Sequence, residues 1–437
     1  SGHVGIINNS CAIRTDGRMS LNGSHTTSWG SAFSDGDIVG VSIDADNGAL
    51  YFAINNTLQN SGNPASGASK TGAPFTWTGG SVTSAFALAD YDDSISVANF
   101  GQDGTFAGNK TAQGNADGNG YGNFFYAPPS GYLALCSQNL TSCAVTPSEH
   151  FSVKLYDDGA GAKTGVGFQP DLVWLKSRGS TYEHELTDAV RGVTKALSSD
   201  SNNVESTDSD GLTAFGSDGF TVGTDNNYDD TTGTGMVAWC WKGGNATLGT
   251  GDFTQGTIAS TCSRNVAAGF SIVSYTGTGS NGTVGHGLSV APNWVIVHRR
   301  TGAVGGWPTG SVQPIGSLDF TDFIRLDITD ALVDMADIWN DTAPTASVFS
   351  LGANIDLNAS SAPYIAYCFH NVEGYSKIGA YEGNASADGS FAYCGFRPSL
   401  VITKPIQTAS SWHMYDSTRS PYNAVAIKMN AHSNAAE

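Results

Sequence analysis

The segment "GDIVGVSIDADNGALYFAINN", residues 36–56, carries the clearest pattern in this chain. Apolar residues alternate with small or polar ones on both sides of an Asp-Asn-Gly, namely Val39, Val41 and Ile43 before it and Leu50, Phe52 and Ile54 after it. Such period-two spacing places every second side chain on the same face of a strand, and Asn-Gly suits the tight turn of a hairpin. The segment therefore predicts a β-hairpin, with Asp44 and Asp46 as turn formers rather than catalytic carboxylates.

The composition of the whole chain agrees with a protein built from strands and turns. Among 437 residues there are 55 glycines, and charged residues make up 14%, against about 25% in an average protein. The length allows roughly three domains. Two short segments, residues 188–197 and 327–339, look helical, and the rest of the chain predicts an all-β fold.

The charge of the chain argues against nucleic acid as a partner, and its lack of long apolar runs argues against membrane insertion. Its formal net charge is -19 and it has no basic run, although phosphate binding needs clustered Lys and Arg. No apolar run approaches the ~18 residues of a membrane span. We therefore expect no nucleic-acid partner and no membrane insertion.

The seven cysteines predict neither a metal site nor a disulfide framework. They include no CxxC pair, and no His cluster has the spacing of zinc ligands. Cys240 and Cys368 lie inside aromatic, strand-like segments, so we expect both to be buried, equivalent to each other and reduced. That state is typical of a protein assembled in a cytosol. The sequence indicates no metal and no cofactor.

After a leading region the sequence repeats itself. "FSVKLYDDGAGAKTGVGFQPDLVWLKSR" at residue 151 is followed by "FSIVSYTGTGSNGTVGHGLSVAPNWVIVHRR" at 270 and "YSKIGAYEGNASADGSFAYCGFRPSLVITKP" at 375. The first and third copies keep an offset of 228 residues in Pro170 and Pro398, Lys176 and Lys404, Asp188 and Asp416, and Arg191 and Arg419. The first and second copies share a closing strand, "MVAWCW" at 236 and "YIAYCF" at 364. A register held over this length indicates a true repeat.

This repeat predicts the domain organisation. Residues 1–143 form a leading β-sandwich domain, residues 144–150 a linker, and three β-sandwich repeats occupy residues 151–242, 270–371 and 372–437, with a connector at 243–269. Each repeat begins with a strand, passes a Gly-rich turn and reaches a second apolar strand after a Pro. Antiparallel sandwiches are the natural structure for such segments.

The third copy stops early relative to the first. Leu197 aligns with Met429 and Glu205 with Glu437, each pair 232 residues apart, whereas the first copy continues for another 36 residues to Trp241. We expect the gene product to continue for at least ~35 residues, with a strand of the pattern apolar-Ala-aromatic-Cys-aromatic, or a neighbouring chain to donate the missing strands. The chain also opens on strand-like residues without Met, so upstream strands are expected too.

The opening hairpin, together with "SISVANFGQD" at 94–103 and "HVGIINN" at 3–9, resembles the core strands of SPRY domains. This resemblance covers about residues 1–105 and implies a concanavalin A-like sandwich of two antiparallel sheets, without its first strands. From residue 101 onward the chain resembles structural proteins of tailed phages, especially marine ones, which join a SPRY-like module to tandem repeats. That resemblance implies a virion protein and transfers no functional residue.

These observations lead to a functional expectation. The chain is expected to be a tail fibre or related appendage of a phage virion, assembled in the host cytoplasm beside other virion proteins. Its loops would bind a host surface glycan or protein without a cofactor, and a homo-oligomer, with a trimer favoured, would multiply weak contacts. Two alternatives stay open: a purely structural head-decoration or connector protein, and a polysaccharide depolymerase. Residues 1–148 contain no Glu, which disfavours a glycan-cleaving leading domain.

Three motifs could carry chemistry and are better explained structurally. Glu183-His184-Glu185 lacks the HExxH spacing of a zinc protease, and we expect it in a solvated loop. The acidic run at residues 225–230 lacks EF-hand spacing and predicts a loop tip. The GxGxxG match at 277–282 is followed by a strand instead of a helix, so it predicts a turn. The sequence assigns no catalytic and no metal-binding residue.

The tryptophans invite interpretation as a carbohydrate platform. Trp174 and Trp239 lie on alternating strands and are expected in the core. Trp307, between two glycines and a proline, is expected in a loop. The ligand-binding residues therefore stay unassigned at the level of sequence.

Overall fold

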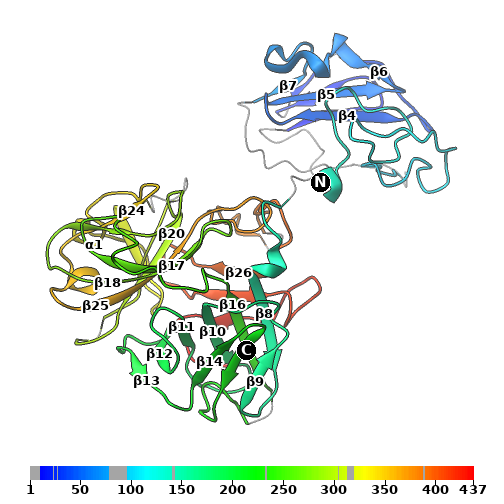
Figure 1. The fold of residues 1–437 in the computed structure, drawn as a ribbon. Coiled ribbons are helices and arrows are strands. Elements are labelled where there is room, and N and C mark those ends of the chain that lie inside the picture. Colours follow the sequence, from blue (N-terminus) through cyan, green and yellow to red (C-terminus); the bar gives the residue numbers. More distant parts are fainter. Residues whose placement is uncertain are drawn as a thin grey trace. The chain divides into compact units, whose positions relative to one another are not determined.

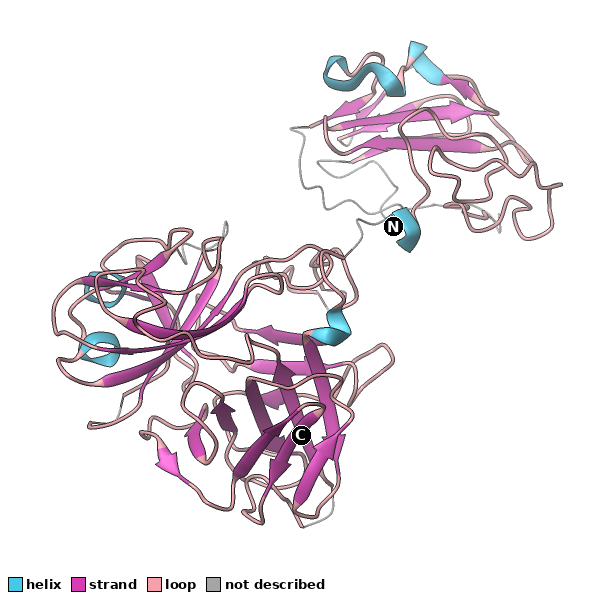
Figure 2. Ribbon diagram, viewed as in Figure 1, coloured by secondary structure: helices cyan, strands magenta, loops and turns pink. Residues whose placement is uncertain are grey.

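The chain divides into two compact units, Ser1–Thr141 and Ser142–Glu437 (Figure 1). The computed structural model describes residues 10–22, 24–26, 28–77, 96–139, 143–231, 234–303, 305–312, 319–386 and 389–437. Strands dominate both units and the helices are short (Figure 2). Among the described residues no helix combines the length and apolarity needed to cross a bilayer.

The first unit contains two small antiparallel sheets. One sheet has the order β1-β2-β3, and the other has β4-β5-β6 with β7 also paired to β5. The bounds are β1 Cys11–Ile13, β2 Met19–Leu21, β3 Ser24–His25, β4 Val39–Asp44, β5 Ala49–Ile54, β6 Thr57–Leu58, β7 Phe75–Thr76, and the 3₁₀ helices η1 Gln59–Ser61, η2 Pro64–Ser69 and η3 Ser137–Asn139.

The predicted hairpin is confirmed as β4 and β5. Val39 pairs with Ile54 at the open end and Asp44 with Ala49 at the turn. The Asp44 carboxylate accepts hydrogen bonds from the backbone N–H and the side-chain amide of Asn47, at 3.0 and 2.9 Å. Gly48 has φ +75°, a conformation that glycine adopts without strain. Asp44 is therefore a turn former, as predicted.

Of the other two SPRY-like segments, the structure describes only residues 96–103. Residues 3–9 lie outside the described residues, as do residues 94 and 95. Residues 96–103 form a loop, in which the Asn99 side chain accepts from the backbone N–H groups of Gly101 and Asp103. The expected last core strand is thus absent from 96–103, because local side-chain bonds satisfy this backbone instead of a sheet neighbour.

The first repeat is a sandwich of a six-stranded and a three-stranded sheet, with orders β13-β12-β11-β10-β16-β8 and β14-β15-β9. Its elements are the 3₁₀ helix η4 Pro147–Glu149, β8 Phe151–Tyr156, β9 Gly161–Thr164, β10 Leu172–Ser177, β11 Glu185–Asp188, β12 Lys195–Ser198, β13 Ser206–Thr207, β14 Leu212–Gly216, β15 Gly219–Val222 and β16 Met236–Trp241. The helix expected at 188–197 is wrong, since β11, a turn and β12 occupy these residues.

The second repeat is built on the same plan. Its sheets have the orders β17-β18-β25-β20-β21-β22-β23 and β19-β24. The elements are β17 Ser260–Asn265, β18 Phe270–Thr276, β19 Gly282–Gly285, β20 Trp294–Arg299, β21 Pro308–Ser311, β22 Asp322–Arg325, β23 Val333–Asp334, α1 Ala336–Trp339, β24 Val348–Leu351, α2 Ile355–Asn358 and β25 Pro363–Phe369. Of the helix expected at 327–339, only the last turn is present, as α1. The segment 243–269, expected to be a connector, contributes β17.

The third repeat has one three-stranded sheet, β26-β27-β28, with bounds Leu400–Thr403, His413–Asp416 and Met429–Asn430. Its pairs match the first repeat, because Leu400 faces Asp416 as Leu172 faces Asp188. The chain is therefore all-β throughout its described parts, with antiparallel pairing in every named sheet.

Buried ion pairs confirm the alignment of the first and third copies. Arg191 binds Asp188 and reaches Glu205 at 3.4 Å, and both side chains of the Arg191–Asp188 pair are fully buried. At the aligned positions, Arg419 binds Asp416 and reaches Glu437 at 3.3 Å. In both copies the Asp also caps the turn, because its Oδ1 accepts the backbone N–H of that Arg.

The three repeats share one central core. The cluster includes buried residues from each copy: Leu172, Trp174, Leu186, Leu197, Val237 and Trp239; Phe270, Ile272, Ile296, Trp307, Ile324, Leu326, Ile365 and Tyr367; Trp412, Met414, Met429 and Ala431. Each repeat thus buries one face of its main sheet against the other two. The first two repeats bury the opposite face under their own small sheets.

Contacts between the repeats run head to tail around a closed ring. The backbone N–H of Glu205 in the first copy donates to the backbone carbonyl of Arg300 in the second, and the N–H of Leu332 in the second donates to the carbonyl of Ile406 in the third. The backbone N–H of Glu437 in the third copy then donates to the carbonyl of Arg178 in the first. The unit therefore has approximate three-fold symmetry within a single chain.

The cysteine prediction is confirmed. Cys240 and Cys368 are fully buried and free, and each lies opposite an equivalent valine, Val173 and Val295. Both thiols face the small sheet of their own repeat.

Candidate functional site

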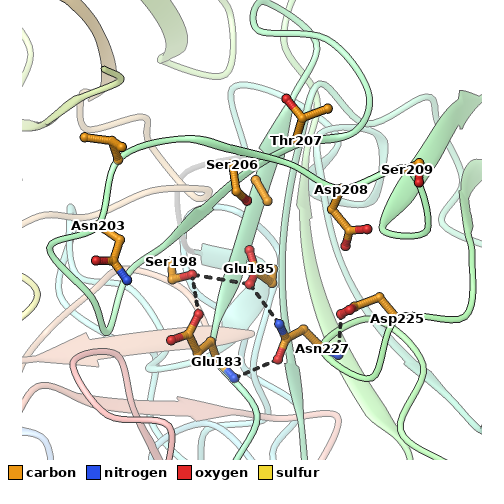
Figure 3. Close-up of a pocket in the computed structure, with 12 residues that line it drawn as sticks. Glu183, Glu185, Ser198, Asn203, Ser206, Thr207, Asp208, Ser209, Asp225 and Asn227 are labelled. Atoms are coloured by element: carbon orange, nitrogen blue, oxygen red, sulfur yellow. Dashed lines mark hydrogen bonds between the residues drawn. The ribbon is translucent and has the colours of Figure 1, made fainter. Parts of the chain in front are cut away.

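A polar pocket of about 410 Å³ opens beside β11, β12 and β13 in the first repeat (Figure 3). Its lining is dominated by carboxyl, amide and hydroxyl groups, among them Glu183, Glu185, Ser198, Asn203, Ser206, Asp208, Asp225 and Asn227. Such groups offer many hydrogen-bond acceptors and several donors at one concave surface.

Strand pairing places the central side chains of the pocket. Glu185 opens β11 and lies opposite Ser198, the last residue of β12. The Ser198 hydroxyl lies 3.1 Å from Oε2 of Glu183 and 3.3 Å from Oε1 of Glu185. A hydroxyl carries one proton, so it donates to one of these two carboxyl groups at a time.

Asn227 connects a second segment to these carboxyl groups. Its side-chain oxygen accepts from the backbone N–H of Glu183 at 3.0 Å, and its Nδ2 donates to Oε1 of Glu185 at 3.2 Å. The backbone N–H of Asn227 donates in turn to Asp225 at 2.9 Å. These bonds fix the orientation of Glu185 before any ligand arrives.

Glu185 is the unusual group of the site. The residue is 4% exposed, and its Oε2 has no hydrogen-bond partner among the described residues. Loss of hydration on burial, reinforced by the negative charge of Glu183, raises the pKa of Glu185 to about 8. At neutral pH this carboxyl group is therefore protonated and can donate as well as accept.

Two neighbouring carboxyl groups are shifted in the same direction. Burial raises the pKa of Asp200 to about 6, and burial also raises the pKa of Asp208. The backbone N–H of His184 donates to Asp200 at 3.0 Å. The charged form is thus disfavoured for Glu185 and Asp208 in the pocket lining, and for Asp200 outside it.

The prediction of a solvated loop at 183–185 is wrong. His184 is fully buried on the core side, where its Nδ1 accepts from Nε1 of Trp174 at 3.0 Å and its ring stacks on Trp239. Desolvation holds the pKa of His184 well below its usual value, so the ring is neutral. His184 is a core residue, and β-strand alternation sends Glu185 to the opposite face.

The acidic run at 225–230 is an exposed tip only at its start. Asp229 and Asp230 are buried, and they accept hydrogen bonds from the backbone of Gly159 and the hydroxyl of Ser177. These bonds tie the run to the sandwich. In the described part of the chain no three His, Cys, Asp or Glu side chains are arranged to hold a metal ion.

The remaining candidates are structural. Trp174 and Trp239 are in the core as predicted. Trp307 lies outside a strand but is fully buried, stacked on His298 with centroids 4.2 Å apart, which excludes it as a carbohydrate platform. Residues 277–281 form the turn between β18 and β19, as predicted, and Gly282 begins β19.

Among the described residues, the Glu185–Ser198 pair of this pocket has no counterpart at the equivalent positions of the other two repeats. Pairing in the sheets makes Pro308 and His413 the equivalents of Glu185, and Arg325 and Asn430 the equivalents of Ser198. In the third repeat His413 hydrogen-bonds Asn430 across the strands at 2.9 Å. The carboxyl cluster is therefore an addition to the shared framework.

The sequence interpretation missed Glu185, Ser198 and Asn227 as site residues. The constant offset of 228 residues aligns Glu185 with His413, and this signal could have placed Glu185 at the start of a strand, as His413 begins β27. Asn227 joins from a distant segment, and no local pattern indicated it.

Comparison with known proteins gives a family but no activity. No curated protein matches the chain, and no solved structure matches it. A family model described as "Domain of unknown function (DUF7483)" matches residues 146–437, the three repeats together. The match covers more than half of the chain and coincides with the second compact unit. The chain is thus a member of the DUF7483 family, and its three repeats make up the family's domain.

Proposed function

We propose that this protein binds a host surface glycan as part of a phage appendage, with the first-repeat pocket as the binding site. The pocket supports the proposal because sugars present many hydroxyl groups, and side chains that both donate and accept suit them. The observation that carries it is Glu185, a buried and fixed carboxyl group with one oxygen unpartnered within the described residues. The hydrogen bonds of Glu185 to Ser198 and Asn227 hold these polar groups in place along the pocket wall, so little ordering is left for a ligand to impose.

A glycan array tests the proposal. The full chain should bind a restricted set of glycans, and Glu185→Gln and Asn227→Ala should each weaken that binding by about tenfold or more. Glu382→Gln is the matched control, since Glu382 is exposed and lies outside the pocket. An array without preference, or equal binding by all variants, would favour a purely structural virion role.

The virion location rests on the resemblance to phage structural proteins. Mass spectrometry of purified particles should find the chain among the tail components. A homotrimer, the expected assembly, would multiply weak glycan contacts through linked sites. Light scattering that finds a stable monomer at micromolar concentration would count against the trimer.

Glycan cleavage is a second candidate for the same pocket. A protonated Glu185 beside Glu183 is the kind of carboxyl pair that acid–base cleavage of a glycosidic bond requires. Host capsule or lipopolysaccharide incubated with the protein should then shorten, and Glu185→Gln should abolish shortening. Binding without any change in chain length would leave recognition as the function.

A further inference from the structure

The open edge of β26 is the feature that the shared plan of the repeats leaves incomplete. In the first repeat β10 lies between β11 and β16, and in the second β20 lies between β21 and β25. The equivalent strand β26 pairs with β27 on one side, and no described strand pairs with its other side. Figure 1 shows β26 in the same unit as the two complete sheets.

Equivalent residues on the core-facing side show what this edge lacks. Trp174 on β10 and Ile296 on β20 are each 3% exposed, whereas Ile402 on β26 is only partly buried against the same central core. Val401, on the opposite face, is 36% exposed, because no described small sheet covers that face of the third repeat. Large apolar side chains elsewhere in the third repeat are also exposed: Tyr381, Phe391, Tyr393, Tyr422 and Val425. An unpaired edge with uncovered apolar residues is a site where another strand can add.

The two complete repeats show which strand fits. In β16, Val237 and Trp239 enter the central core, while Ala238 and Cys240 face the small sheet. In β25, Ile365 and Tyr367 enter the central core, while Ala366 and Cys368 face the small sheet. Both strands thus direct a bulky apolar residue and an aromatic residue to the central core, and two small residues to the small sheet of the same repeat.

We propose that the free edge of β26 binds an antiparallel partner strand of this pattern, apolar-Ala-aromatic-Cys-aromatic. By the register of the other repeats, the Cys lies opposite Val401 and the preceding aromatic opposite Ile402. The added strand completes the sheet of the third repeat and extends the central core. The proposal is independent of the glycan-binding proposal, because the pocket lies in the first repeat.

A fused strand provides the test. Since Glu437 is equivalent to Glu205, a copy of residues 206–242 joined after Glu437 presents the β16 sequence to β26 at high effective concentration. The matched control carries the same extension with Val237→Asp and Trp239→Asp in the appended copy. Amide hydrogen exchange is measured in all three chains, and unchanged exchange in β10 shows that the fold is intact.

We expect the native extension to slow exchange of the edge amides of Leu400–Thr403 by about 100-fold or more, and the control extension to leave it unchanged. Equal exchange in all three chains would overturn the proposal. Slow exchange already present in the unextended chain, together with a dimer by light scattering, would also overturn it. That result would make a second copy of this chain the occupant of the edge.

Discussion

Glu185 shows how burial couples one residue to the pH dependence of the whole fold. Its pKa is about 8 in the folded chain and about 4.5 in an unfolded one. Between these pH values the folded state keeps a proton that the unfolded state has released. Stability from this group is therefore present below about pH 4.5 and is lost as the pH rises to about 8.

Glu185→Gln should remove this dependence, because the amide is neutral at every pH. Relative to the native chain, the variant should gain on the order of 3–5 kcal/mol in free energy of unfolding between pH 4.5 and 8.5. Urea titrations over this range measure the difference. Glu382→Gln, which removes an exposed carboxyl group outside the pocket, is the control. Parallel pH profiles for the native chain and Glu185→Gln would show that Glu185 ionises normally.

The buried Arg191 has a different role, since it compensates a buried charge. Arg191→Met would leave Asp188 without its cation, and the side chains of both residues are fully buried. We expect a loss of about 3–5 kcal/mol in the free energy of unfolding. Arg14→Met is the control, because the Arg14–Asp16 pair is 45% and 41% exposed and should cost less than ~1 kcal/mol. Similar losses for both variants would contradict this interpretation.

At the scale of elements, burial in β16, β17 and β25 protects one thiol in each strand from reagents in solution. Burial raises the pKa of Cys240, Cys262 and Cys368, and that of Cys262 reaches about 12, so almost no reactive thiolate forms at neutral pH. We expect a thiol reagent to modify these residues only after unfolding, whereas exposed Cys143 reacts at once. Mass spectrometry of briefly labelled protein identifies the sites. Rapid labelling of Cys240 or Cys368 would show that these strands open readily.

Elements with local causes were predictable from the sequence, and those with distant causes were not. The β4–β5 hairpin follows from its own alternation and turn residues. Residues 188–197 look helical in the sequence, but the Asp188 and Arg191 side chains brace a turn between paired strands. The misplacement of Glu185 has the same origin, since its burial depends on Ser198 and on Asn227 from another loop. Repeat alignment was the one long-range signal, and the ion pairs at Glu205 and Glu437 confirm it.

At the scale of the whole molecule, the shared core predicts that the three repeats unfold together. Leu186 and Met414 are equivalent residues of the first and third repeats, and both lie in the central cluster. Their amides should open with free energies that agree within ~1 kcal/mol, as native-state hydrogen exchange measures. The third repeat has the smallest sheet, so an independent repeat would exchange much faster at Met414. Faster exchange there would show that the repeats are separate domains.

The contacts of the head-to-tail ring also specify the circular order of the three repeats. Each repeat donates one backbone N–H and accepts at one backbone carbonyl. The donor and acceptor residues are Glu205 and Arg178 in the first repeat, Leu332 and Arg300 in the second, and Glu437 and Ile406 in the third. In the observed order both glutamates meet an arginine and the leucine meets the isoleucine. The reverse order would place one glutamate on isoleucine and the leucine on an arginine. Side chains at three joints thus distinguish two circular arrangements that the common backbone bonds would permit equally.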